Sequence, residues 1–111
     1  MRKIEAILEP HQLDEVKEAL GLIGVRGMTA AEVKGTNPKP TTTRYRGAEY
    51  AVHLQPKIRI EIVVEDDLAD AVVRRLVVTA NRGRLSDGMI FVLPMEDAVR
   101  IRTGEHGPDA I

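Results

Sequence analysis

The side chains most suited to recognition gather in one short stretch, Arg44 to Tyr50, which reads Arg-Tyr-Arg-Gly-Ala-Glu-Tyr. It closes a long polar segment, Lys34 to Gln55, set between two strand-like runs. A compact domain of this size seldom spends so many residues on one connection unless the connection has a function. An ordinary hairpin loop with a polar tip is the alternative interpretation.

A second group is the run Asn81 to Gly88, which holds two glycines, short polar side chains and two arginines. Backbone N–H groups in such a run can approach an anion, and the arginines supply positive charge. A helix end followed by a turn with solvated arginines is the alternative, and no Walker A sequence is present. Arg100 and Arg102 are two apart, so on a strand they would share a face and hold phosphates together, or pair with surface acids.

An enzymatic function would have to use Glu61, Asp87 or a histidine for acid–base chemistry. The three histidines, His11, His53 and His106, are widely spaced and form no metal-binding pair. No Ser–His–Asp signature is visible either. We therefore expect no catalytic residue and no metal site. A purely structural trimer is a third class of function, beside a nucleotide-binding regulator and an enzyme. A protein of this class would have no affinity for nucleotides.

The totals point to one domain, because 111 residues with 43% hydrophobic content support a single modest core. There is no cysteine, which excludes disulfides and fits a cytoplasmic protein. A net charge of −1 argues against non-specific nucleic-acid binding. The sequence also lacks a signal-peptide segment and any apolar run of about 18 residues that would insert into a membrane.

The periodicity of the apolar residues predicts alternating strands and helices. The expected helices run from about His11 to Ile23, ended by Gly24, and from about Asp67 to Ala80, with Asp66 and Asp67 at its N-cap. The expected strands are Arg2–Glu9, Gly27–Lys34, a strand resuming near Ala51 and strongest over Lys57–Val64, Met89–Pro94, and a strand-like alternation over Val99–Arg102.

This order predicts an α+β, ferredoxin-like βαββαβ domain over residues 1–111, with a four-stranded antiparallel sheet and two helices on one face. A long loop, about 36–55, joins the second and third strands. Glu61 lies in a strongly apolar strand, so it faces an open sheet surface, pairs with a base or contacts a ligand. The uncovered sheet face predicts association with further copies.

The sequence also resembles the PII signal-transduction family over nearly its whole length. The resemblance rests on matching segments that occur in the same order and at the same spacing as in the family. Two of them, the Tyr-Arg-Gly-Ala-Glu-Tyr run and the Arg-Ile-Arg-Thr-Gly-Glu run, are specific to that family. The matching segments are Gly27-Met28-Thr29, Glu32-Val33-Lys34-Gly35, Tyr45 to Tyr50, Pro56-Lys57, Ile60 to Val64, Thr79-Ala80, Gly83, Asp87-Gly88, Ile90-Phe91-Val92 and Arg100-Ile101-Arg102-Thr103-Gly104-Glu105.

The resemblance implies a homotrimer that binds ATP or ADP between subunits and uses its T-loop to control an enzyme, transporter or regulator of nitrogen metabolism. One subunit would supply Lys57, Glu61, Asp87, Gly88 and Gly35, and its neighbour Gly27, Met28, Thr29, Arg100 and Arg102. The nucleotide-contacting loop, about 81–89, adds Arg82, Gly83, Arg84 and Ser86, and a C-terminal loop follows at about 103–111. The loop residues implied in partner binding are Lys39, Arg44, Tyr45, Arg46, Glu49 and Tyr50.

The resemblance further implies that Tyr50 is a candidate for modification by a nucleotidylyltransferase, and that Mg²⁺ accompanies ATP. Four departures from the family pattern matter. The segment after Gly35 has two prolines and no glutamine, Ser86 replaces a glycine, Met89 replaces a lysine, and Glu9 replaces a common lysine. We therefore expect weak or absent binding of 2-oxoglutarate. The alternative function is a divergent sensor of ADP, AMP or another small metabolite for a pathway outside nitrogen metabolism.

Overall fold

The computed structural model describes the backbone of residues 1–36, 41–45, 48–52, 54–84 and 87–111. Side chains are described for residues 1–36, 54–84 and 87–111. Short 3₁₀ turns lie at Pro10–Gln12, between the first strand and the first helix, and at Gly107–Ala110, near the C-terminus. The helices are α1 (Leu13–Leu22) and α2 (Asp66–Ala80), and the strands are β1 (Arg2–Leu8), β2 (Thr29–Gly35), β3 (Thr41–Tyr45), β4 (Ala48–Val52), β5 (Gln55–Val64) and β6 (Ile90–Pro94).

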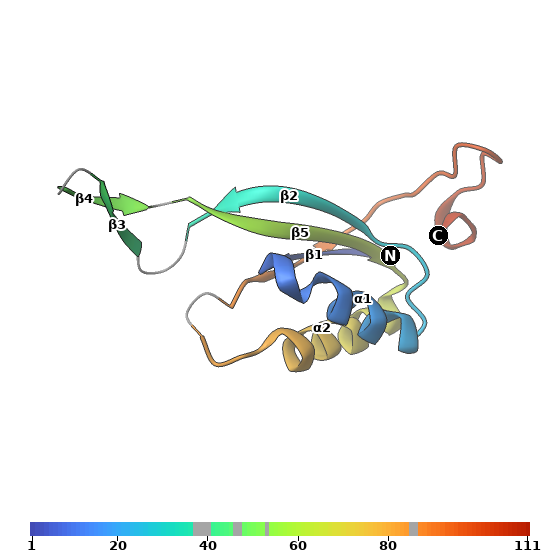
Figure 1. The fold of residues 1–111 in the computed structure, drawn as a ribbon. Coiled ribbons are helices and arrows are strands. Elements are labelled where there is room, and N and C mark those ends of the chain that lie inside the picture. The colour runs from blue at the N-terminus through green and yellow to red at the C-terminus, as the bar shows by residue number, and fades with distance from the viewer. Residues whose placement is uncertain (37–40, 46–47, 53, 85–86) are drawn as a thin grey trace.

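A four-stranded antiparallel sheet in the order β2-β5-β1-β6 forms the body, and both helices cover one of its faces (Figure 1). This arrangement confirms the expected ferredoxin-like fold. Strands β3 and β4 form a separate antiparallel pair, in which Thr43 lies opposite Tyr50, and this pair extends away from the body. In the described part of the chain, none of the helices has the length and apolar character needed to cross a bilayer.

The core lies between the helices and the sheet because alternate strand residues point to that side. Alternate residues of β1 and β5 are buried, and so are the central apolar residues of both helices; Leu13, Ile23, Leu68 and Ala80 pack at the margin. The buried hydrophobic residues are Ile4, Ala6, Leu8, Val16, Leu20, Ile58, Ile60, Ile62, Val64, Ala69, Val72 and Leu76.

Several element boundaries differ from those expected. Pro10–Gln12 forms a 3₁₀ turn, so α1 begins at Leu13 rather than His11. Glu65 is extended and caps α2, so Asp66 and Asp67 lie in its first turn, where their charges favour the helix. Pairing with β5 begins at Thr29 rather than Gly27. Ala51 belongs to β4, and the long central strand starts only at Gln55.

The strand expected over Val99–Arg102 was wrong. Val99 forms only an isolated bridge with His106, and the residues that follow it turn back. The turn is closed because the N–H of Gly104 donates to the carbonyl of Arg100 (2.8 Å), while Gly104 has φ +73°, which favours glycine. The alternating sequence therefore has no sheet to join, and Arg100 and Arg102 do not share a strand face.

Candidate functional site

The long loop leaves the sheet at a close-packed point, which we call the loop-base corner: Glu9, Gly35, Lys57 and Gly88. Lys57 is only 5% exposed, and its Nζ lies 2.6 Å from Oε1 of Glu9. A Cβ at Gly35 would lie 3.3 Å from Cγ of Lys57. The stem of the lysine is therefore enclosed by the loop base, and its charge is matched by a carboxylate from the end of β1.

Gly88 is fixed directly against β1. A Cβ at this position would lie 1.4 Å from the carbonyl oxygen of Ile7, a distance that no side chain can accept. The N–H of Ile7 donates to the carbonyl of Met89 at 2.9 Å, which holds the two segments together. The sequence Asp-Gly at this point thus reflects a close approach of two backbones, and it brings Gly88 to the loop-base corner.

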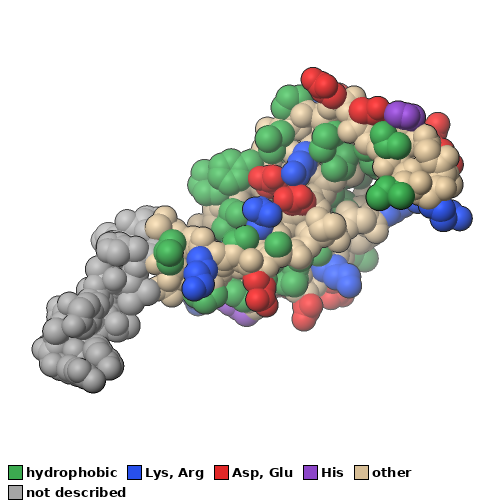
Figure 2. Space-filling view, turned by 90° about the horizontal axis from the view of Figure 1, so that it is seen from above, with side chains coloured by type: hydrophobic (Ala, Val, Ile, Leu, Met, Phe, Trp, Pro, Cys, Tyr) green, Lys and Arg blue, Asp and Glu red, His purple; other side chains and the backbone are tan. Residues whose placement is uncertain are grey.

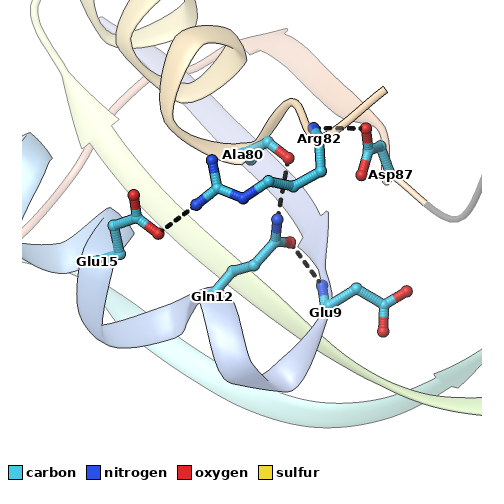
Figure 3. Close-up of polar contacts among 6 residues, drawn as sticks. All are labelled: Glu9, Gln12, Glu15, Ala80, Arg82 and Asp87. Atoms are coloured by element: carbon cyan, nitrogen blue, oxygen red, sulfur yellow. Dashed lines mark hydrogen bonds and ion pairs between the residues drawn. The ribbon is translucent and has the colours of Figure 1, made fainter. Parts of the chain in front are cut away.

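The connection from α2 to β6 is organised by Asp87 (Figure 3). Its Oδ2 accepts hydrogen bonds from the backbone N–H groups of Arg82 (2.8 Å) and Arg84 (3.0 Å). These bonds hold the pKa of the Asp87 carboxyl below its ordinary value, and the bond from Arg82 makes the largest contribution. Asn81 likewise accepts from the N–H of Gly83 at 2.9 Å. Three of the backbone donors that the sequence suggested for an anion, those of Arg82, Gly83 and Arg84, are therefore engaged within the loop.

The same connection is tied to α1 and to the turn before it by Arg82 and by two side chains that the sequence did not single out, Glu15 and Gln12 (Figure 3). Arg82 Nη2 lies 2.6 Å from Oε2 of Glu15, so its guanidinium is directed to the helix surface. The buried Gln12 donates from Nε2 to the carbonyl of Ala80 (2.9 Å) and accepts from the N–H of Glu9 (3.1 Å). Gln12 thereby fixes the end of β1, where Glu9 meets Lys57.

A cavity of about 970 Å³ opens at the other end of β5, and we call it the wide pocket. It brings together Gly27, Met28, Thr29 and Glu61, which the sequence had singled out for a nucleotide. Apolar side chains make up much of the remaining wall and would suit a flat heterocycle with polar edges. The further lining residues are Lys3, Gly24, Val25, Arg26, Val63, Val64, Glu65, Asp67, Leu68, Met95, Pro108 and Ile111.

Glu61 alternates with the buried Ile60 and Ile62, so it lies on the open face of the sheet. Charged side chains on this face are bordered by apolar side chains (Figure 2). Its carboxylate lies 3.4 Å from Lys3 Nζ and 3.2 Å from Arg59 Nε. Lys3 also pairs with Glu5 at 3.0 Å, and this bond, with Glu61 adding to it, raises the pKa of Lys3. Glu61 thus faces the open sheet surface and pairs with bases, which confirms two of its three expected roles, while contact with a ligand stays a prediction.

The C-terminal segment forms part of the pocket wall through Pro108 and Ile111, which the sequence analysis missed. Asp97 anchors this segment, because its Oδ2 lies 2.8 Å from Nδ1 of His106 and its Oδ1 accepts from the N–H groups of Ala98 (2.9 Å) and Gly107 (3.1 Å). The bond to His106 is the main reason that the pKa of Asp97 lies below its ordinary value. An Asp nine residues before a His gives no sequence signal, because only the turn at Gly104 brings them together.

The chain divides the expected nucleotide residues into two groups. Thr29 is opposite Glu61 and Val33 is opposite Lys57, so the groups sit four residues apart along β5, which is about 13 Å at 3.3 Å per residue. Within one chain Glu61 therefore lies with Gly27, Met28 and Thr29, and the expected assignment of these residues to two subunits stays a prediction.

The remaining expected residues lie at the surface or outside the described residues. Arg100 and Arg102 are exposed at the C-terminal turn and line neither group in a single chain. Lys39, Arg46, His53 and Ser86 lie outside the described residues, as do the side chains of Arg44, Tyr45, Glu49 and Tyr50. Among the described residues, no three histidine, aspartate or glutamate side chains gather as metal ligands would.

These features define a small ferredoxin-like α+β domain with a long loop between β2 and β5, a buried lysine near one end of β5 and an open pocket at the other. The family model described as "Nitrogen regulatory protein P-II" matches residues 1–105. Over the full length of both chains, the sequence is 53% identical to Nitrogen regulatory protein P-II of Azospirillum brasilense and 50% identical to Nitrogen regulatory protein P-II 1 of Escherichia coli K12. The chain belongs to the P-II family.

Proposed function

We propose that this chain is a regulatory protein, not an enzyme, that senses adenine nucleotides and passes the signal to a target protein through the loop at 36–55. The family membership supports a role in nitrogen regulation. The site supports binding rather than catalysis, because its charged groups are matched with one another: Glu61 with Lys3 and Arg59, and Lys57 with Glu9.

The wide pocket is the observation that carries this proposal. Its apolar wall suits an adenine ring, and Thr29 and Glu61 offer polar partners at its edge. The phosphates would extend toward the loop-base corner of another copy, with Arg100 and Arg102 supplying charge-assisted contacts. A homotrimer would bring these groups together and would cover the open sheet face, where Phe91 and Leu93 are 45% and 40% exposed.

Calorimetric titration with ATP, ADP and AMP, each with and without Mg²⁺ and 2-oxoglutarate, tests the proposal. We expect micromolar binding of at least one adenine nucleotide to a species whose mass by light scattering is that of a trimer. A monomer at micromolar concentration would contradict the assembly. The absence of nucleotide binding would instead favour the purely structural class.

The loop would contact the target in the cytoplasm, with Tyr50 as a site for a nucleotidylyltransferase. Its polar composition and its position away from the body support this role (Figure 1). Deleting residues 41–51 should preserve the trimer and abolish regulation. A deletion variant that unfolds would show that the loop is structural.

The oxoacid 2-oxoglutarate should bind weakly or not at all, because no glutamine is present between Gly35 and Tyr50 and two prolines remove backbone donors. The ratio of nucleotides would then be the main input. Met89 removes a positive charge near the phosphates, and Ser86 replaces a glycine there; both departures favour the second candidate function, a sensor of ADP or AMP for another pathway.

A further inference from the structure

The charge of Lys57 has an unusual environment for a lysine, since this side chain is almost always exposed. Here it is 5% exposed, while its Glu9 partner is 23% exposed. A buried ammonium is destabilised when no negative charge lies near it. The corner therefore contains a position beside Lys57 that favours an anion.

Glu9 fills that position from a fixed point of the backbone. It is the N-cap of the 3₁₀ turn and forms a capping box with Gln12, whose amide is in turn bonded to Ala80 on α2. Pro10 follows immediately and restricts the residue before it to extended conformations, as observed for Glu9 (φ −68°, ψ 142°). Little conformational freedom is lost when the carboxylate meets the lysine.

The same position faces the groups that a ligand at the loop base would use. Gly35 encloses the stem of Lys57, and Gly88 reaches the neighbouring residues of β1 through its contact with Ile7. An acid that arrived here would need the ammonium of Lys57, and it would meet the negative charge of Glu9. A group on the same chain competes at an effective concentration of roughly millimolar or more.

We propose that Glu9 is a built-in carboxylate ligand of Lys57, which occupies an anion site that would otherwise receive a small diffusible dicarboxylate. Glu9 is then a specificity-determining residue: it makes the loop base unresponsive to organic acids and leaves the nucleotide as the signal. The inference depends on the proposed function only for the identity of that signal.

The test is a titration of Glu9→Gln with 2-oxoglutarate, followed by calorimetry with and without Mg-ATP. Glutamine keeps an oxygen of the same reach for the start of the turn and removes only the charge. We expect the acid to bind at least about tenfold more tightly than it binds the wild-type protein.

Glu15→Gln is the matched control, because Glu15 forms an ion pair of the same length, 2.6 Å, with the exposed Arg82. It should bind the acid no better than the wild-type protein. The double variant Glu9→Gln/Lys57→Met should lose the gained affinity. If the double variant retains it, the acid binds elsewhere and the proposal is wrong.

Equal acid affinity in Glu9→Gln and the wild-type protein would also overturn the proposal. If Glu9→Gln does not fold, Glu9→Asp is the alternative variant, because its carboxylate is one methylene further from Lys57. This variant should bind the acid more tightly than the wild-type protein, by a smaller factor than Glu9→Gln. Unchanged acid affinity in Glu9→Asp would also contradict the proposal. Nucleotide titration of the wild-type protein without any acid tests the proposed function separately. A chain that binds no nucleotide but gains acid binding through Glu9→Gln would refute that function and keep this inference.

Discussion

The loop-base corner and the wide pocket lie at opposite ends of β5 and are built in opposite ways. At the corner, Lys57 is buried against Gly35, and Gly88 touches the backbone of β1. The pocket leaves about 970 Å³ open, and its C-terminal wall is held by Asp97 and His106, whose side chains are 50% and 67% exposed. The corner is defined by close packing of its atoms, whereas the pocket is defined by the open volume between its walls.

The difference separates two kinds of residue importance. A substitution at the corner acts on the stability of the fold, because packed atoms and a buried charge have nowhere else to go. A substitution at the pocket acts on binding or on local order, because water can replace most of the contacts that are lost. Substitutions at each end of β5 test this division.

Gly88→Ala should have the largest effect. The added Cβ would lie 1.4 Å from the Ile7 carbonyl oxygen, so β1 and the loop must separate. We expect a loss of at least about 3 kcal/mol in the free energy of unfolding, measured in urea at fixed protein concentration.

The matched control for Gly88→Ala is Gly21→Ala in α1, where a Cβ meets nothing within 4 Å. Because alanine favours helices more than glycine does, this variant should gain about 0.5–1 kcal/mol. Gly88→Ala at wild-type stability would mean that the corner is not close-packed, and the comparison would fail.

Glu9→Gln should have the next largest effect. It leaves the buried ammonium of Lys57 without its counter-charge, and we expect a loss of about 2–3 kcal/mol, below the full cost for a buried pair because Glu9 is 23% exposed. Glu15→Gln should cost less than about 0.5 kcal/mol, since surface ion pairs contribute little. Urea unfolding of the two variants measures both values, and similar losses would show that burial does not separate these equally short pairs.

The sequence predicted the body well because its signals are local. Alternating isoleucines identify β5, and apolar residues three and four apart identify the helices, so the topology and most of the core follow. The errors fall where a local pattern has no partner in space. Val99 to Arg102 alternates like a strand, but the sheet already ends at β6, and the chain turns back instead.

The site was predictable only in part, for a related reason. Gly27 to Thr29 and Glu61 were found as residues, and the register of β2 with β5 places them together. The pairing of Glu9 with Lys57 joins residues 48 apart, and that of Arg82 with Glu15 joins residues 67 apart, so no spacing rule indicates them. The role of Asp87 as an acceptor for its own loop also depends on the folded turn.

Arg102→Ala tests the pocket end of the comparison. If Arg102 contacts phosphates across a subunit boundary, the variant should bind adenine nucleotides at least about tenfold more weakly, since charge-assisted contacts contribute roughly 1.5–3 kcal/mol. Its stability should match that of the wild-type protein because the side chain is exposed. Arg74→Ala, on the exposed surface of α2, is the control for a lost positive charge. Unchanged calorimetric affinity in Arg102→Ala would remove Arg102 from the site.

The smallest effect should come from Asp97 and should be confined to the C-terminal segment. His106 and the N–H groups of Ala98 and Gly107 bind the ionised carboxylate, so the pKa of Asp97 in the folded chain lies below the ordinary value of 3.8. The stabilisation is therefore present above pH 3.8 and is lost as the pH falls through the lower, folded-state pKa.

Asp97→Asn should produce the same loss of stabilisation in the C-terminal segment at neutral pH. The amide of Gly107 should then exchange faster in NMR spectra while the amides of β5 stay protected, and nucleotide affinity should fall modestly because Pro108 and Ile111 leave the pocket wall. Asp109→Asn, in the same segment, controls for the change of charge. If the amides of Gly107 and of β5 lose protection from exchange together, Asp97 stabilises the whole fold. The pocket end would then contribute to the stability of the fold as the corner does, and the division between the two ends would be wrong.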